Sequence, residues 1–164
     1  MAFYTNSSTI GANFGNSDGA TALFGLGNTS MGQYDTEWVY VCAIQALATG
    51  TAVVINSSGS ADLLNGTLST TSTGKQIAFA QGTFSASDYG WVARRGNGIY
   101  VRVSSVSTAS NILYNCDNSG TLTTATATNT FGGISIITAS ATGVAAAVPA
   151  FVSWPRLLTT PFIV

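Results

Sequence analysis

The stretch Tyr89–Val103, YGWVARRGNGIYVRV, decides the fold class of this chain. Aromatic and β-branched residues, which fit a pleated surface, occupy both of its ends. Between the ends lies an Asn97-Gly98 pair, and both of these residue types tolerate the positive φ angles of a two-residue turn. The pattern therefore predicts a β-hairpin that joins strands 89–94 and 99–103. The residues of the second strand that would face the core are Ile99, Val101 and Val103.

Short strands are expected along the rest of the chain as well. They are predicted over 37–43, 52–55, 76–80, 111–116, 121–124, 134–139 and 151–157. Helix is poorly supported, since the best candidate, 43–49, is short and is followed by Gly50. No internal repeat is evident. Strands at roughly ten-residue spacing with Gly, Asn and Ser turns predict an all-β fold, a single-domain β-barrel or β-sandwich.

Residues 1–35 differ from the domain that follows, which we place at 36–164. Gly, Asn, Ser and Thr dominate this segment, and its glycines argue against a helix. We interpret it as an extended N-terminal arm whose apolar residues dock onto its own barrel or onto a neighbouring subunit. The candidate contact residues of the arm are Phe3, Tyr4, Phe14, Leu23, Phe24 and Leu26. A second candidate contact is the C-terminal tail, with Phe162, Ile163 and Val164, because burial of each large apolar side chain is worth about 1.5–3 kcal/mol.

The chain is unusually poor in ions. Charged residues make up 7% of its 164 residues, the formal net charge is −1, and there is no histidine. Five Lys and Arg are too few to neutralise a nucleic-acid backbone, and a histidine-dependent hydrolase is excluded. A soluble protein normally keeps a charged coat. A surface made of Ser, Thr, Asn and Gln suits either a protein packed against other subunits or a secreted surface protein.

The search for catalytic chemistry returns little, and we expect no enzyme, no metal and no cofactor. Asp35 and Glu37 would alternate to one face of a strand start, and this is more typical of a charged strand edge than of a glycosidase pair. The run Asp117-Asn118-Ser119-Gly120 has ordinary turn chemistry rather than the ligand count of a calcium loop. Cys42 and Cys116 are expected to be free thiols, with a single disulfide as the alternative. Residues 1–9 carry no secretory signal pattern.

The basic residues gather in the predicted hairpin. Arg94, Arg95 and Arg102 make up three of the five cations, and Arg94 and Arg102 could share a face. The cluster is either a solvated hairpin tip or a contact to carboxylates of a partner, which guanidinium groups pair with bidentately. Trp91 and Trp154 are expected in the core, and a sugar-stacking platform is the other interpretation.

Two local runs carry a resemblance to a known group of proteins. One is Glu37-Trp38-Val39-Tyr40-Val41, followed by Val53-Val54-Ile55. The other is Ile77-Ala78-Phe79-Ala80, followed by Ala86-Ser87-Asp88-Tyr89-Gly90-Trp91-Val92 and the Asn-Gly turn. Over residues 35–157 the chain resembles the head decoration, or capsid cement, proteins of tailed bacteriophages. The resemblance implies a compact β-barrel or sandwich, often with an N-terminal arm and commonly trimeric, and it carries over no catalytic residue.

The resemblance and the composition together lead to one expected function. The chain would be a virion structural protein that binds the outer surface of a phage head and stabilises contacts between capsomers. Its partners would be the major capsid protein and two further copies of itself, with no nucleic acid and no membrane. It would be made in the cytoplasm of the host bacterium. The alternative is a carbohydrate- or receptor-binding module of a phage fibre or knob.

Overall fold

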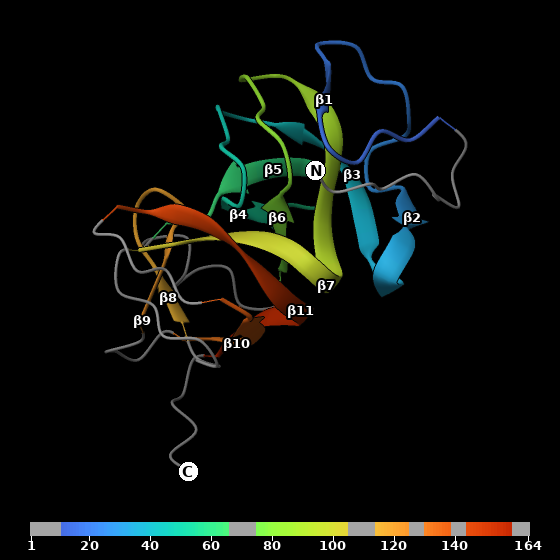
Figure 1. The fold of residues 1–164 in the computed structure, drawn as a ribbon. Helices are drawn as coiled ribbons and strands as arrows, with labels where there is room; N and C mark the ends of the chain where they lie inside the picture. The colour runs from blue at the N-terminus through green and yellow to red at the C-terminus, as the bar shows by residue number, and fades with distance from the viewer. Residues whose placement is uncertain (1–10, 66–74, 105–113, 125–129, 139–143, 159–164) are drawn as a thin grey trace.

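The structure is a computed structural model, and it describes residues 11–65, 75–104, 114–124, 130–138 and 144–158. Eleven strands form one mixed sheet, which confirms the predicted all-β class (Figure 1). The strands are β1 (Ser17–Gly19), β2 (Thr29–Met31), β3 (Glu37–Ala43), β4 (Ala52–Ile55), β5 (Ser60–Leu63), β6 (Gln76–Ala80), β7 (Tyr89–Val103), β8 (Tyr114–Cys116), β9 (Leu122–Thr124), β10 (Thr130–Ile136) and β11 (Ala146–Leu158). One short 3-10 turn, η1 (Gln33–Asp35), precedes β3. The best helical candidate, 43–49, is not helical: β3 ends at Ala43, and Leu47 forms an isolated bridge with Phe84.

The strand pairings close into two five-membered rings. In the first ring β3 pairs with β5, β5 with β4, β4 with β6, β6 with β7, and β7 with β3. In the second ring β7 pairs with β9, β9 with β8, β8 with β10, β10 with β11, and β11 with β7. The 15-residue β7 belongs to both rings, and it runs from one group of strands into the other in Figure 1.

The two rings repeat one topology. In each, the first strand pairs with the third in parallel, and every other pairing in the ring is antiparallel. The second and third strands keep the same register at a spacing of 61 residues: Ile55 faces Ala61, and Cys116 faces Leu122. The repeat lies in the strand topology and not in a clean repeat of the sequence, since strand positions require only apolar, β-compatible side chains.

The turn between those two strands is the clearest mark of the repeat. In the first ring Asn56 Oδ1 accepts hydrogen bonds from Ser58 N (3.0 Å), Ser58 Oγ (2.6 Å) and Ser60 N (3.0 Å). In the second ring Asp117 Oδ1 accepts from Ser119 N (2.8 Å), Ser119 Oγ (2.7 Å) and Thr121 N (3.0 Å). Each is a turn organised by an Asx side chain, which confirms turn chemistry at Asp117.

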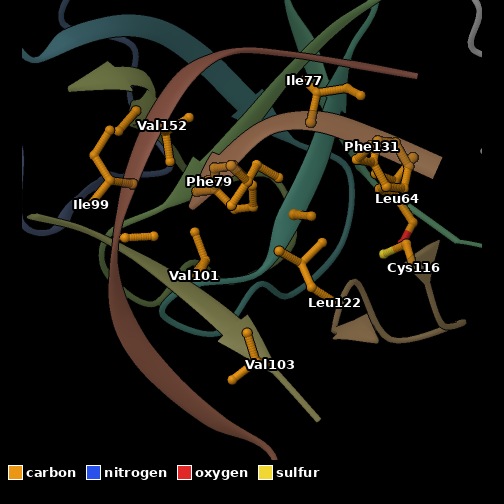
Figure 2. Packing of buried hydrophobic residues seen from close by; sticks show 14 of the residues in the cluster. Leu64, Ile77, Phe79, Ile99, Val101, Val103, Cys116, Leu122, Phe131 and Val152 are labelled. Carbon is orange, nitrogen blue, oxygen red and sulfur yellow. The ribbon is translucent and has the colours of Figure 1, made fainter. Parts of the chain in front are cut away.

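Alternate residues of the first-ring strands face two different clusters. Ala78 and Ala80 belong to a cluster drawn from all five strands of the first ring, which is therefore the interior of that ring. Ile77 and Phe79 share the opposite face and join the second, larger cluster. That cluster contains residues from every strand of the second ring (Figure 2). The larger cluster therefore holds the two rings together.

The predicted hairpin at Asn97-Gly98 is wrong. The chain continues through this point as β7, and the positive φ angles of Gly96 (135°) and Gly98 (75°) produce irregularities in one strand rather than a reversal. The first part of β7 pairs with β3, and its second part pairs with β11, with a register shift opposite Gly98. The alternation predicted for its second part is confirmed, since Ile99, Val101 and Val103 are all buried.

The described part of the arm packs on its own sheet. Phe14 is 2% exposed, lies parallel to Trp38 at 4.5 Å between ring centroids, and meets Trp91 edge-on at 5.5 Å. Phe24, half-buried, contacts the rings of Tyr40 and Trp91. Of the two docking surfaces considered for the arm, these phenylalanines use the chain's own core.

Candidate functional site

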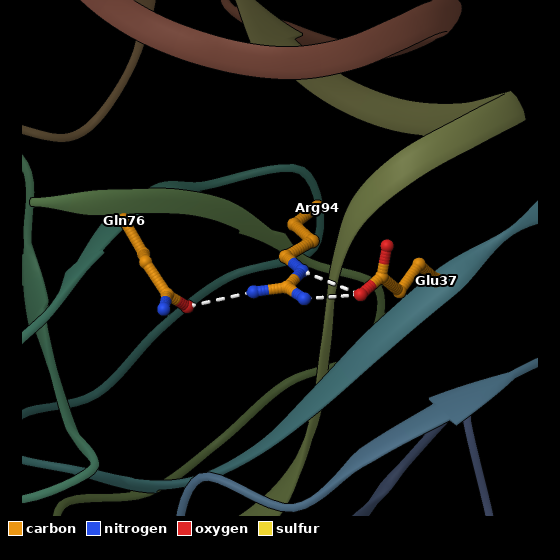
Figure 3. A network of polar contacts seen from close by, with 3 residues as sticks. All are labelled: Glu37, Gln76 and Arg94. Carbon is orange, nitrogen blue, oxygen red and sulfur yellow. Dashed lines mark hydrogen bonds and ion pairs between the residues drawn. The ribbon is translucent and has the colours of Figure 1, made fainter.

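Two carboxylates of the chain itself engage the predicted arginine cluster. Arg94 Nε donates to Glu37 Oε1 at 3.0 Å, its Nη2 also binds that oxygen, and its Nη1 donates to Gln76 at 2.9 Å (Figure 3). Arg95 pairs with Asp35. The Arg94 and Glu37 side chains are only 13% and 11% exposed, whereas those of Arg95 and Asp35 are 35% and 65% exposed. Arg94 is therefore held as part of the sheet, and the exposed Arg95–Asp35 pair adds little stability.

Arg102 lies apart from the other two arginines. It lines a groove of 570 Å³ with Asp117 and Ser119 of the second turn, and with Ser104. Within the described residues its guanidinium forms no ion pair. The three arginines predicted as one cluster thus have three different environments: Arg94 is largely buried in an ion pair, Arg95 is in an exposed ion pair, and Arg102 lines a groove.

Four of the nine exposed large apolar side chains of the described residues lie on the segment between β1 and β3. Leu23 is 61% exposed, Leu26 42%, Met31 40% and Tyr34 75%. The arm therefore has two kinds of residue: Phe14 and Phe24 pack inward, and these four present apolar surface to solvent. Tyr34 sits at φ 57° inside η1, a conformation that is rare for an aromatic residue. Of the predicted contact residues, Phe3, Tyr4, Phe162, Ile163 and Val164 lie outside the described part of the chain.

Trp154 is the exposed tryptophan of the described residues. It is 44% exposed, so the prediction that it lies in the core is wrong, whereas Trp91 is buried at 1% as predicted. The cause is a bulge between β10 and β11, where one residue of β10, Gly133, faces three residues of β11. Gly133 packs directly against the carbonyl oxygen of Ser153, which leaves no room for a Cβ. A bulge of this kind redirects a side chain out of the sheet.

The exposed indole lies in a groove that we call the Trp154 groove. Its volume is 460 Å³, and its lining residues are Lys75, Gln76, Ile77, Arg94, Trp154, Pro155 and Arg156. The Arg94 guanidinium carbon lies 4.6 Å from the centre of the indole ring, a cation–π contact. Three of the five cations of the chain therefore line one groove. Sequence reasoning missed it because these residues are brought together by strands β6, β7 and β11.

The remaining groups considered for chemistry are carboxylates and cysteines. Across the described residues, no group of three or more Cys, Asp and Glu side chains could hold a metal ion. Asp35 and Glu37, considered above as a carboxylate pair, each bind an arginine. Cys42 and Cys116 are both free thiols, as expected. Burial raises the pKa of the Cys116 thiol, whose Sγ donates to the Leu64 carbonyl at 3.3 Å.

No protein-family model matches the sequence, and no curated protein matches it. The only helical element in the described segments is three residues long, far short of what crossing a bilayer requires.

Proposed function

We propose that the protein decorates the outer surface of a phage head and stabilises contacts between capsomers as a homotrimer. The observation that carries the proposal is the arm, in which Phe14 and Phe24 pack on the core while other apolar side chains remain exposed. Leu23, Leu26, Met31 and Tyr34 expose apolar surface on a chain with 7% charged residues. Burial of each such side chain against a partner is worth about 1.5–3 kcal/mol, less where it is already half-buried.

The segments that carry the resemblance to capsid cement proteins support the same proposal. Glu37–Val41 lies in β3, Val53–Ile55 in β4, Ile77–Ala80 in β6 and Tyr89–Val92 in β7. These are neighbouring strands of the first ring, so the resemblance concerns one contiguous structural unit. The arm pairs with the same ring through β1 and β2, which places its apolar residues on a rigid support.

The proposed task requires contact area rather than chemistry. A specific interface buries about 1,200–2,000 Å², and a closed trimer repeats each contact three times. Linked contacts reinforce one another through effective concentration. A small subunit can therefore add considerable free energy to the joints of a shell without a catalytic residue.

The experiment is a competition for heads that lack the protein. A Leu23→Ser, Tyr34→Ser variant competes with the unaltered protein for the same heads, and its occupancy is read from pelleted particles. We expect at least tenfold weaker binding, since the two lost contacts together are worth more than about 1.4 kcal/mol. The matched control is Val144→Ser, because Val144 is 71% exposed but lies outside the arm, two residues before β11 of the second ring. Equal occupancy by the double variant and the control would exclude the arm as the contact.

The alternative function, a carbohydrate- or receptor-binding module, is favoured by a different observation. The Trp154 groove presents an exposed aromatic ring among polar side chains. A module of this kind would not need heads for binding, so the two functions separate in the competition experiment.

A further inference from the structure

Trp154 is held in a strained backbone conformation. Its φ is 48°, in the left-handed region that bulky residues rarely adopt. The buried Pro155 follows it and restricts its backbone further. Strain of this kind persists only where the surroundings enforce it, and it occurs preferentially at ligand sites. Here the bulge of β11 enforces it, and the result is an indole projected out of the sheet.

Arg94 fixes the position of the indole. Its guanidinium lies over the ring at 4.6 Å and is itself held by Glu37 and Gln76. Because the Glu37 carboxylate already neutralises the charge of Arg94, we assign this arginine to holding the indole ring and not to binding an anionic ligand. The exposed part of the indole is thus a rigid aromatic surface, fixed before any ligand arrives.

Two further cations of the groove are free to bind a ligand. Within the described residues, neither Lys75 nor Arg156 forms an ion pair, and both are exposed. No carboxylate lines the groove. Since the whole chain has a net charge of −1, this local excess of positive charge selects for an anionic ligand.

At the groove, β6 and β11 are each paired on one side only within the described segments. Gln76 and Ile77 pair with β4, whereas β6 reaches β7 only at Phe79 and Ala80. Arg156 pairs with β10, whereas the pairing of β11 with β7 ends at Ser153. An extended peptide can pair with such an edge, so an acidic peptide is one of the ligands that the test must distinguish. A nucleic-acid strand needs a longer basic track than two free cations. A compact ring-shaped ligand needs only the aromatic surface and a few polar groups.

We infer that the Trp154 groove binds an acidic saccharide, with a sugar ring against the exposed indole and its carboxylate between Lys75 and Arg156. The volume of 460 Å³ accommodates a short oligomer. This inference does not depend on head decoration, because the groove lies on β6, β7 and β11 while the proposed head contact lies on the arm.

Tryptophan fluorescence tests the inference directly. Trp38 and Trp91 are 0% and 1% exposed, so quenching by acrylamide reports mainly on Trp154. The probe is tetragalacturonic acid, and the matched control ligand is the same oligomer with every carboxylate methyl-esterified. We expect the acidic oligomer to protect Trp154 from quenching and the ester to protect it at least tenfold more weakly.

Variants assign the binding to this groove. Lys75→Gln and Arg156→Gln should each weaken binding about tenfold, since each removes a hydrogen bond to a charged group. Trp154→Ala, followed by calorimetry, should abolish it. Arg95→Gln is the control, because Arg95 is a cation outside the groove. Equal protection by the ester, by adenosine monophosphate or by tetraglutamate, an acidic peptide, would overturn the inference, as would unchanged affinity in both cation variants.

Discussion

Replacement of Phe14 by alanine should destabilise the protein strongly. Phe14 lies in the arm, before the first strand of either ring, but its side chain is part of the larger core cluster. The ring is 2% exposed, stacks on Trp38 with an interplanar angle of 4°, and meets Trp91 edge-on. Truncation of a buried phenylalanine costs about 3–5 kcal/mol. For a domain of this size, each kcal/mol lowers the melting temperature by about 2–4 °C. The expected decrease is therefore about 6–20 °C.

The assay is thermal unfolding followed by near-ultraviolet circular dichroism, which reports on the packing of the aromatic rings. Leu23→Ala is the matched control, because Leu23 belongs to the same segment but is 61% exposed. Its free energy of unfolding should change by no more than about 0.5 kcal/mol. A Phe14→Ala variant that melts within 2 °C of the unaltered protein would refute the packing of the arm on its own core.

Three further results are expected. Asn56→Ala and Asp117→Ala should each lower the free energy of unfolding by about 1–2 kcal/mol, since each removes the acceptor that binds two backbone N–H groups. The assay is unfolding by denaturant. An effect of only one of the two substitutions would contradict the equivalence of the two turns. Stability should decline as the pH rises above about 9. Burial raises the pKa of the Cys116 thiol above its ordinary 9.0 and the pKa of Tyr40 above its ordinary 10.0. The unfolded chain therefore loses these protons at a lower pH than the folded protein does, and deprotonation favours the unfolded chain. Melting that does not change between pH 8 and pH 10.5, or a Cys116→Ala variant with an equally steep decline, would show that this thiol does not contribute. Finally, a thiol reagent at pH 8 should leave Cys116 unmodified in the folded protein, as read by mass spectrometry, and modify it once the protein is unfolded.

The strand positions could be predicted from local sequence, and the closure of the rings could not. The limits of β3, β4 and β6 follow from runs such as Glu37–Ala43, in which aromatic and β-branched residues are dense. β5 (Ser60–Leu63) was missed, because its composition is that of a turn and its strand state depends on pairing with β3 and β4. The Asn97-Gly98 pair misled for a related reason: tertiary pairing with β11 overrode the local turn preference.

The candidate site was predictable in its residue types and not in its arrangement. Arg94 stood out as part of a basic cluster, but its partner Glu37 lies 57 residues away in the sequence, on β3. Trp154 was expected in the core because its sequence neighbours resemble those of a buried strand. The bulge that exposes it arises from the register shift between β10 and β11, which the local sequence does not show. Strain and cation–π contacts of this kind are properties of the folded chain.

The internal repeat explains how a chain so poor in ions builds a stable scaffold. Two rings share β7, and residues from both contribute to one large apolar cluster. The core is therefore continuous across the repeat, and the surface is free to consist of Ser, Thr, Asn and Gln. Such a surface gives little electrostatic repulsion between neighbouring molecules, which fits a subunit that works in a dense array.

The most direct measurement of the central proposal is a saturation binding curve on phage heads that lack the protein. If the protein decorates the shell, bound copies rise to a plateau at a fixed ratio to the coat subunits, and the loaded heads release their DNA at a higher temperature than bare ones. If the protein stays in the supernatant as a 16.7 kDa monomer at every concentration, and the heads open at an unchanged temperature, the proposal is wrong.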